Sequence, residues 1–441
     1  VICSDKTGTL TQNKMTVKEI FVAGRKLTVD QVDRTDPLQE PLIRAALLCS
    51  DIQLGYWVYI LTDVDYVFHH PLGLLAALLL LTILVVGVAN LAGKDRSFSE
   101  SENRNLAQKP QFSWTSLADG SWFAGLTDWY SDQFFGRDRW ISMHLWETRR
   151  LGQKESGGVW LGKDGYLLSP AEAPDTEALA RTAETMNRFA LEHPDLNQWM
   201  LLAPNAASVL TDKLPKNAPS RDQLPDIQTA EAQISVQPLD AVSPLLAHTE
   251  EEIYYHTDHH WTALGAYYAY ASAADRLGQY MASPAFAILP VSDSFEGTLA
   301  SRAGVHRVKD VINVYIPQGV ETTYYVNYPD TQERSTSMFV SSALEEKDKY
   351  TLFFGGNHPL VEIWTTADTE RNLLVLKDSY ANCFMQFLTA YYDRIIMVDP
   401  RYYYEELSTV LSAYNITDVL FLYSGDTWMT DTALADVLAT G

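Results

Sequence analysis

The sequence predicts an α/β fold, specifically a three-layer α/β/α domain with a largely parallel sheet. Short apolar runs of four to six residues recur in the second half of the chain and alternate with segments of helical spacing, a pattern typical of buried strands covered by helices. Apolar residues make up 46% of the chain and aromatic residues 12%, enough to form large buried cores. The length of 441 residues indicates roughly three domains.

The main body covers residues 94–441, and its elements can be predicted in chain order. Apolar positions at helical spacing predict helices, whereas short apolar runs bounded by turn residues predict strands. Residues 280–350 are richer in short β-like pieces and predict an inserted β-rich region. The predicted helices are 177–193, 258–278 and 380–392, and the predicted strands are 197–205, 350–356, 372–379, 394–399 and 416–425.

Residues 72–92 contain no charged side chain. A helix of this length rises about 30 Å, which matches the hydrocarbon core of a bilayer. A buried core helix seldom runs so far without a charge, and a cleaved signal peptide is shorter and closer to the N-terminus. The segment therefore predicts one transmembrane helix, preceded by a linker over residues 55–71.

The charges beside this helix do not settle its orientation. Lys94, Arg96 and Arg104 follow it, and no Lys or Arg stands immediately before it. Taken literally, the positive-inside rule places the large domain in the cytoplasm. The N-terminal segment looks foreign to the rest of the chain, however, so we expect a single-pass cell-membrane protein with its large domain outside the cytoplasm.

The charge distribution separates two unlike pieces. The chain has 33 Lys and Arg against 56 Asp and Glu, for a formal charge of −23. Residues 1–54 contain seven of each sign, so the whole excess lies in residues 55–441. Such an acidic chain argues against nucleic-acid binding, which requires a basic surface. Three cysteines are too few for a disulfide framework.

The first candidate for chemistry is LLVLKDSYANCF, where a buried strand runs into a turn and then a helix. The turn places the hydroxyl of Ser379 at the carboxyl edge of the predicted sheet. Backbone N–H groups there can stabilise an oxyanion. In the simpler alternative, Asp378 or Ser379 caps the helix, because both residue types favour that position.

The second candidate is the segment His256 to Trp261. A serine nucleophile needs a base, and the base needs an acceptor that fixes its tautomer. Asp258 and His260 are two residues apart, so in extended backbone their side chains point the same way. One alternative is a capping aspartate with half-exposed histidines. Another is a zinc site, which would need a distant ligand such as His306 or His358.

The third candidate is the Gly-Gly turn that ends the predicted strand 350–356. Gly356 and Asn357 follow this strand, and the Asn357 amide could donate to a developing oxyanion. Glycine and asparagine are also common in ordinary turns, which is the alternative.

The motif Asp258-His259-His260-Trp261 resembles the signature of the DHHW proteins, which are relatives of the SGNH-type hydrolases and of the alginate O-acetyltransferases. Four further segments resemble the same family, so that the resemblance covers residues 56–441. They are SFSESENRNLAQKPQFS, WYSDQFFGRDRW, GVWLGKDGYLL and KDSYANCF. This resemblance implies an SGNH-like fold and a triad of Ser379, His260 and Asp258. It also implies an oxyanion loop at Gly356 and Asn357.

The sequence departs from the family pattern in one place. Lys377 stands where the G-D-S segment of the acetyltransferases has glycine, which could alter the approach of a substrate. His259 receives no role in the triad, and we expect it to be structural. The resemblance implies no cofactor and no metal.

The resemblance implies a membrane-anchored serine esterase or O-acyltransferase that acts on a cell-surface polysaccharide or a related acylated substrate. A membrane-bound protein that donates the acyl group is an expected partner. An alternative of another class is a non-catalytic surface protein that binds glycan on the same fold, with Trp and Tyr side chains for stacking.

Residues 1–54 open with VICSDKTGTLTQNKMTV, which resembles the phosphorylation segment of P-type cation ATPases. In that family the aspartate, here Asp5, accepts phosphate from ATP. The reaction needs Mg²⁺ and positioned cations to offset the incoming charge. The family supplies these from a nucleotide-binding domain and further loops that are not seen here. We interpret residues 1–54 as a truncated, non-functional fusion, and ATPase activity as a remote alternative.

Overall fold

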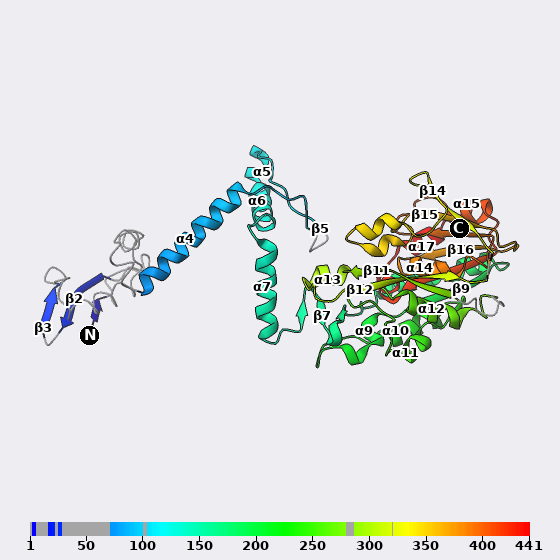
Figure 1. Ribbon diagram of the computed structural model, residues 1–441, viewed down its shortest axis with the longest axis horizontal. Coiled ribbons are helices and arrows are strands. Elements are labelled where there is room, and N and C mark those ends of the chain that lie inside the picture. The colour runs from blue at the N-terminus through cyan, green and yellow to red at the C-terminus, as the bar shows by residue number, and fades with distance from the viewer. Residues whose placement is uncertain are drawn as a thin grey trace. The chain divides into compact units, whose positions relative to one another are not determined.

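The computed structural model describes residues 2–5, 16–22, 25–28, 71–99, 104–278, 286–319 and 321–441. The chain divides into two compact units, Val1–Lys94 and Asp95–Gly441 (Figure 1). Most of the ATPase-like motif and the predicted linker lie outside the described residues.

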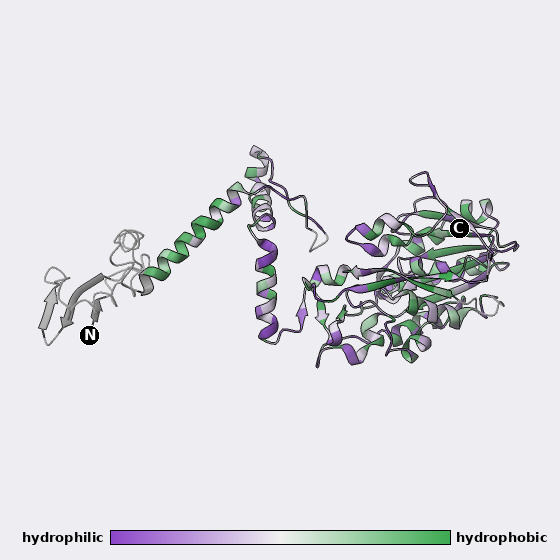
Figure 2. Ribbon diagram, viewed as in Figure 1, coloured by the Kyte–Doolittle hydropathy of each residue, from purple (hydrophilic) through white to green (hydrophobic). Residues whose placement is uncertain are grey.

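The first unit contains a small antiparallel sheet and one long helix. The sheet consists of β1 (Ile2–Asp5), β2 (Thr16–Val22) and β3 (Arg25–Thr28). The helix α4 (Pro71–Ala92) coincides with the uncharged segment, and most of its coloured part is hydrophobic (Figure 2). The side chains of α4 are described from Leu74 to Asn90, and no helix within the described residues is long and apolar enough to cross a membrane. The predicted transmembrane helix is therefore not confirmed.

The second unit contains the remaining elements. Its helices are α5 (Trp114–Ala118), α6 (Ser121–Asp132), α7 (Arg137–Arg150), α8 (Thr176–Glu192), α9 (Ala206–Val209), α10 (Leu224–Ala232), α11 (Val242–Ala247), α12 (Ala263–Ala273), α13 (Thr298–Ala303), α14 (Tyr380–Phe384), α15 (Leu407–Ala413), α16 (Gly425–Thr430) and α17 (Ala433–Leu438). Its strands are β4 (Phe98–Ser99), β5 (Arg104–Asn105), β6 (Glu155–Ser156), β7 (Val159–Leu161), β8 (Leu167–Leu168), β9 (Asn197–Ala203), β10 (Gln237–Leu239), β11 (Phe286–Phe295), β12 (Asp310–Pro317), β13 (Tyr324–Tyr328), β14 (Glu333–Ser335), β15 (Leu360–Thr365), β16 (Asn372–Lys377), β17 (Arg394–Val398) and β18 (Asp418–Ser424).

The main sheet has eight strands in the order β10-β9-β18-β16-β17-β15-β13-β14. The pairs from β10 to β17 are parallel, whereas the pairs from β17 to β14 are antiparallel. The α/β class is confirmed, but the sheet is mixed. The β-rich region explains part of this difference, because its strands β13 and β14 join the main sheet as a hairpin, which produces antiparallel neighbours.

The sheet separates two hydrophobic cores. Leu201 and Leu373 point into one core, and their neighbours Met200 and Leu374 point into the other. This alternation is the two-residue period of a strand, and burial on both faces makes the strands read as continuous apolar runs. Helices lie on both sides of the sheet (Figure 1), so the second unit has the three layers that the sequence predicts.

Three predicted elements differ from the structure, and one of them, the helix predicted over 380–392, is only α14 followed by a 3₁₀ helix, Met385–Phe387. Residues 350–356 are not a strand: a 3₁₀ helix, Lys349–Leu352, leads into a turn in which Phe354, Gly355 and Gly356 all have positive φ. Three such residues in a row cannot continue a strand. The predicted helix 258–278 begins only at α12, because the five residues before it form the loop that holds the candidate site.

Candidate active site

The turn after β16 presents Ser379. The carboxylate of Asp378 accepts the N–H of Tyr380 at 2.9 Å and the N–H of Ser424, at the end of β18, also at 2.9 Å. Ser379 itself makes no capping hydrogen bond to α14. Asp378 therefore holds the turn in place, and the Ser379 hydroxyl is available for another partner.

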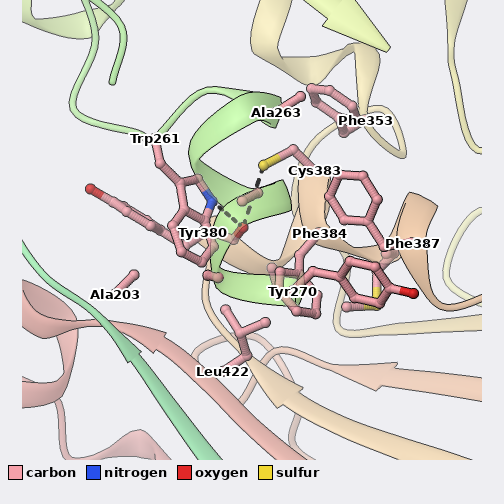
Figure 3. Packing of buried hydrophobic residues seen from close by; sticks show 14 of the residues in the cluster. Ala203, Trp261, Ala263, Tyr270, Phe353, Tyr380, Cys383, Phe384, Phe387 and Leu422 are labelled. Atoms are coloured by element: carbon pink, nitrogen blue, oxygen red, sulfur yellow. Dashed lines mark hydrogen bonds between the residues drawn. The ribbon is translucent and has the colours of Figure 1, made fainter. Parts of the chain in front are cut away.

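The loop before α12 carries Asp258 and His260. Tyr254 and Trp261 close the loop with an antiparallel bridge, and the indole Nε1 of Trp261 donates to the carbonyl of Tyr380 at 3.0 Å. Figure 3 shows this bond within the aromatic packing around Tyr380. The loop is thereby fixed to the helix that follows Ser379.

The side chains of Ser379, His260 and Asp258 form a continuous hydrogen-bonded line. Nε2 of His260 lies 2.8 Å from Oγ of Ser379, and its Nδ1 lies 2.5 Å from Oδ1 of Asp258. Asp258 is 1% exposed and His260 is 5% exposed. Since a carboxylate is an acceptor, Nδ1 carries the proton, which leaves Nε2 able to accept one from Ser379.

Asp258 is also held by the start of α13. Its Oδ2 accepts the N–H of Thr298 at 2.8 Å and the Thr298 hydroxyl at 3.0 Å. A Cβ atom on the preceding residue, Gly297, would lie 2.3 Å from Cβ of Asp258, so only glycine permits this approach. The sequence analysis missed both residues, and no local signal could have found them, because they lie about forty positions from Asp258.

His259 occupies the outer side of this cluster. Its Nδ1 lies 2.8 Å from the Thr298 hydroxyl oxygen. Because that hydroxyl donates to Asp258, Nδ1 of His259 is the donor in this contact. His259 therefore supports the Thr298 bond to Asp258.

The surroundings shift the pKa values of the acid and the base. Burial alone raises the pKa of Asp258, but the charges of His259 and His260 and the bonds from His260 and Thr298 together bring it below its ordinary value. Burial lowers the pKa of His260, and the charge of His259 lowers it further, to about 4. At neutral pH His260 is therefore an uncharged base beside an ionised carboxylate.

Tyr350 is a third residue of the site that no sequence pattern revealed. Its ring stacks on His260 with centroids 3.8 Å apart and planes at 12°, and its hydroxyl donates to the carbonyl of Ser379 at 3.0 Å. Burial raises the pKa of Tyr350 well above its ordinary value, so it remains a donor. It fixes both the base and the nucleophile turn.

Lys377 is buried at 1% exposure beneath this turn. Its Nζ contacts Oδ1 of Asn382 at 2.9 Å, Oδ1 of Asn357 at 3.2 Å and the Asp399 carboxylate at 3.5 Å. Arg401 binds the same carboxylate through two contacts of 2.6 and 2.8 Å. The ammonium group that the sequence places at the family's glycine position is thus surrounded by acceptors.

The two oxyanion candidates, Gly356 and Asn357, differ in which of their N–H groups already have a partner. The N–H of Gly356 donates to the carbonyl of Phe353 at 3.3 Å. Asn357 accepts at Oδ1 from Lys377 and from Asn382, the latter at 3.2 Å. Because Lys has donors only, the atom of Asn357 that faces it is the oxygen, which directs Nδ2 the other way.

Three of the residues considered for a metal site lie close together, and the suggested distant ligands contact other groups. Within the described part of the chain, Asp258, His259 and His260 offer ligand atoms within 4.8 Å of one another. The suggested distant ligands have other partners, because His306 contacts Glu296 at 3.0 Å and His358 contacts Asp330 at 2.8 Å.

Comparisons with known proteins show similarity in sequence and in fold. The model of the DHHW protein family matches residues 102–156 and 241–398, which include the Asp258–Trp261 motif and Ser379. Over these segments the chain is similar to the DHHW proteins. A DHHW family protein from Eubacterium siraeum has a similar structure, with 24% identity and a TM-score of 0.54 over 64% of this chain and 95% of that one. Bacillus cereus PatB1, solved with a sulfonyl adduct, gives 20% identity and a TM-score of 0.52 over 62% and 98%.

Two curated relatives are similar to this chain over very different lengths. The probable alginate O-acetylase AlgJ of Pseudomonas syringae is 24% identical over 283 residues, which cover 60% of this chain and 66% of AlgJ. Calcium-transporting ATPase 1 of Lactococcus lactis is 50% identical over 54 residues, which cover 12% of this chain and 6% of the ATPase. The second match is short and corresponds to the ATPase-like segment.

The site predicts an unusual titration for His260. We expect the midpoint of its imidazole resonances in an NMR titration to lie below about 6.5, the value of an unperturbed histidine, because burial disfavours the charged ring. The substitution His259→Gln removes a positive charge beside His260, so the midpoint of the His260 titration should rise.

The control is His248→Gln, since His248 pairs with Glu251 instead and should leave His260 unchanged. A wild-type midpoint at or above 6.5 would contradict this account of the site.

Proposed function

We propose that this protein is a serine-dependent acyl-ester enzyme, either an esterase or an O-acyltransferase. The observation that carries the proposal is the line of two hydrogen bonds, 2.8 Å and 2.5 Å, that joins Ser379 to His260 and His260 to Asp258. A nucleophile, a base and an orienting acceptor in this order are the requirements of acyl transfer through a covalent intermediate. The O-acetylase relative supports the same class of reaction.

In the first step, Oγ of Ser379 attacks the carbonyl carbon of the ester, and Nε2 of His260 takes the hydroxyl proton. The buried carboxylate of Asp258 stabilises the imidazolium that forms. When the tetrahedral intermediate collapses, the departing alcohol takes the proton from His260 and leaves an acyl-Ser379 ester.

In the second step, a water molecule or a sugar hydroxyl attacks the acyl-Ser379 carbonyl and gives its proton to Nε2 of His260. Collapse then breaks the bond to Ser379, whose Oγ recovers that proton. Water as the acceptor makes the protein an esterase, and a hydroxyl of a cell-surface polysaccharide makes it an O-acyltransferase. We propose the polysaccharide as acceptor and a membrane-bound protein as the source of the acyl group.

The oxyanion donor in this proposal is Asn357, with Lys377 as a positioning residue. The contact from Lys377 Nζ to Oδ1 fixes the orientation of the amide and leaves Nδ2 to donate. A donor held in place before the reaction stabilises the charge that develops in the transition state.

Removing the nucleophile tests the enzyme proposal. Ser379→Ala deletes one oxygen, so folding should be preserved while turnover of a simple acetyl ester falls on the order of 10³-fold or more. His260→Ala should be about as severe and the double variant scarcely worse, because the residues act as a unit. The matched control is Ser412→Ala, at an exposed serine that bonds only within its own helix.

A wild-type protein inert toward every acyl ester, with glycan affinity that survives Ser379→Ala, would instead support the binding-protein alternative.

A double-mutant cycle tests the roles of Asn357 and Lys377. Asn357→Ala should lower kcat by on the order of 10²-fold with little change in KM. Lys377→Met should also lower kcat, but its effect should vanish in the Asn357→Ala background, because it acts through the amide. Thermal unfolding of each variant reports the separate cost of altering a buried cluster. Independent, additive losses in kcat would contradict the positioning role.

We also propose that α4 anchors the protein in a membrane, with the second unit outside the cytoplasm, where the polysaccharide lies. The proposal rests on its 22 uncharged residues and on the exposure of its large apolar side chains, such as Leu75 and Leu84 at 67% and 63%. Large exposed apolar surfaces are typical of interaction with lipid or protein. We attribute no cation transport to the ATPase-like segment.

Fractionation of cells that express the full chain tests the anchor. The protein should sediment with membranes in high salt and be released by detergent. The double variant Leu78→Arg and Leu81→Arg should shift to the soluble fraction, since each buried charge costs about 2.5–3.5 kcal/mol at the centre of a membrane helix. Protease added to spheroplasts should degrade the second unit. A wild-type chain found in the soluble fraction would contradict the anchor.

A further inference from the structure

A hollow of about 230 Å³ lies beside the site and contains two arginine side chains, Arg149 and Arg307. Arg149 is at the end of α7, and Arg307 is in the loop between α13 and β12. Neither guanidinium has an ion pair within the described residues, whereas Arg104, for example, binds the Asp132 carboxylate. Arg149 is half-buried and Arg307 is exposed, so this hollow presents two cations that have no carboxylate partner among the described residues.

The two guanidinium groups act on each other. Burial lowers the pKa of Arg149, and the charge of Arg307 lowers it further. Like charges near one another repel, and an anion placed between them removes that repulsion. Guanidinium groups also bind carboxylate and phosphate with two parallel hydrogen bonds, which gives both affinity and orientation.

Nearby carboxylates do not neutralise the two guanidinium groups. Asp310 accepts the N–H groups of His256 and Thr257 at 2.8 and 2.9 Å and also the hydroxyl of Thr257. Asp164 pairs with Lys213 at 2.9 Å. These acidic groups are already matched by donors, so an external anion remains the missing partner of the two arginines.

The walls of the hollow are fixed by backbone packing. Gly165 has a φ of +91°, and a Cβ atom there would lie 2.6 Å from the Val308 side chain; one on Gly162 would lie 2.8 Å from two carbonyl oxygens. The N–H of Leu167 donates to the carbonyl of His256 at 2.7 Å. A hollow built from such close contacts exists before a ligand arrives, which lowers the cost of binding.

The hollow is linked to the triad by two elements. Thr257 lines the hollow and precedes Asp258, and its carbonyl accepts the N–H of Ala300 in α13 at 3.0 Å. The same helix begins at Thr298, which binds Asp258, and ends just before Val305, which lines the hollow. A helix of six residues spans about 9 Å, so the hollow lies within about that distance of the contact between Thr298 and Asp258.

We propose that this hollow is an anion-binding subsite that holds a carboxylate or phosphate group of the polymer substrate. This inference rests on the proposed function and adds the chemical class of the substrate: an anionic polymer. The volume of the hollow suits one charged group and the ring that carries it, since sites for complete drug-sized ligands are about 300–1,000 Å³. A uronic-acid polymer and a polyol-phosphate polymer offer the same chemistry.

Binding to the full chain in the Ser379→Ala background, measured by calorimetry at low salt, tests the subsite without turnover. The probes are hexagalacturonate for the carboxylate, a glycerol-phosphate oligomer for the phosphate, and cellohexaose as the neutral reference. We expect one anionic probe to bind, and its identity distinguishes the two sources. Arg149→Gln and Arg307→Gln should each weaken that binding by about tenfold or more. Arg149→Lys should only partly preserve it, because lysine lacks the planar fork.

The matched control is Arg150→Gln, since the Arg150 guanidinium stacks on Trp146, with 4.6 Å to the ring centroid, and should change affinity by less than about twofold. Thermal unfolding verifies that each variant is folded. Three results would overturn the inference: no binding of either anionic probe, equal binding of cellohexaose, or full affinity in both glutamine variants.

The result is separable from the proposed function. Arginine-dependent binding by a wild-type protein that turns over no ester would refute the enzyme and leave the subsite. Ester turnover without binding of either anionic probe would refute the subsite alone.

Discussion

A carboxylate that is removed from water has to be matched by donors, and Asp258, at 1% exposure, imposes this requirement on the whole site. An unpaired buried charge costs several kcal/mol. Asp258 is matched by the His260 ring and backbone and by the backbone and hydroxyl of Thr298. These donors come from its own loop and from α13, so the need to satisfy one charge fixes two elements that are distant in sequence. The same contacts hold the imidazole in the tautomer that can accept a proton.

A second cluster of charged groups surrounds Lys377, which is buried two residues before Ser379. Lys377, Asp399 and Arg401 are joined through the Asp399 carboxylate, and the ammonium group also contacts Asn357. The site thus combines a carboxylate that favours a proton on His260 with an ammonium group that orients an amide. Such a division of charge suits acyl transfer, in which a proton moves to one side of the reacting carbon and negative charge develops on its oxygen.

The inserted region contributes to the site as well as to the sheet. Residues 280–350 provide Thr298 against Asp258 and Tyr350 against His260, and they also provide Arg307 in the anion subsite. The parallel strands β16 and β18 supply the edge at which Ser379 lies. The central sheet positions the nucleophile, and the insertion shapes its surroundings, so substrate preference in this chain is expected to depend on the insertion.

The sequence alone determined what depends on local spacing and on burial. Apolar runs marked β9, β16, β17 and β18, because strands buried on both faces contain few polar residues, and the short motif from Asp258 to Trp261 marked the loop that holds the acid and the base. Their proximity does not come from extended backbone, because residues 256–260 form a series of bends in which Asp258 accepts the N–H of His260. The tertiary structure decided the rest. Phe353 and Phe354 are buried and satisfy the core equally well in a strand or in a turn, so their pattern did not reveal the turn that presents Asn357. Thr298, Tyr350 and the partners of Lys377 act through contacts between residues far apart in the chain, and such contacts leave no periodic signal. The same limit applies to Arg149 and Arg307, because charges on separate elements form a site only when folding brings them to one hollow.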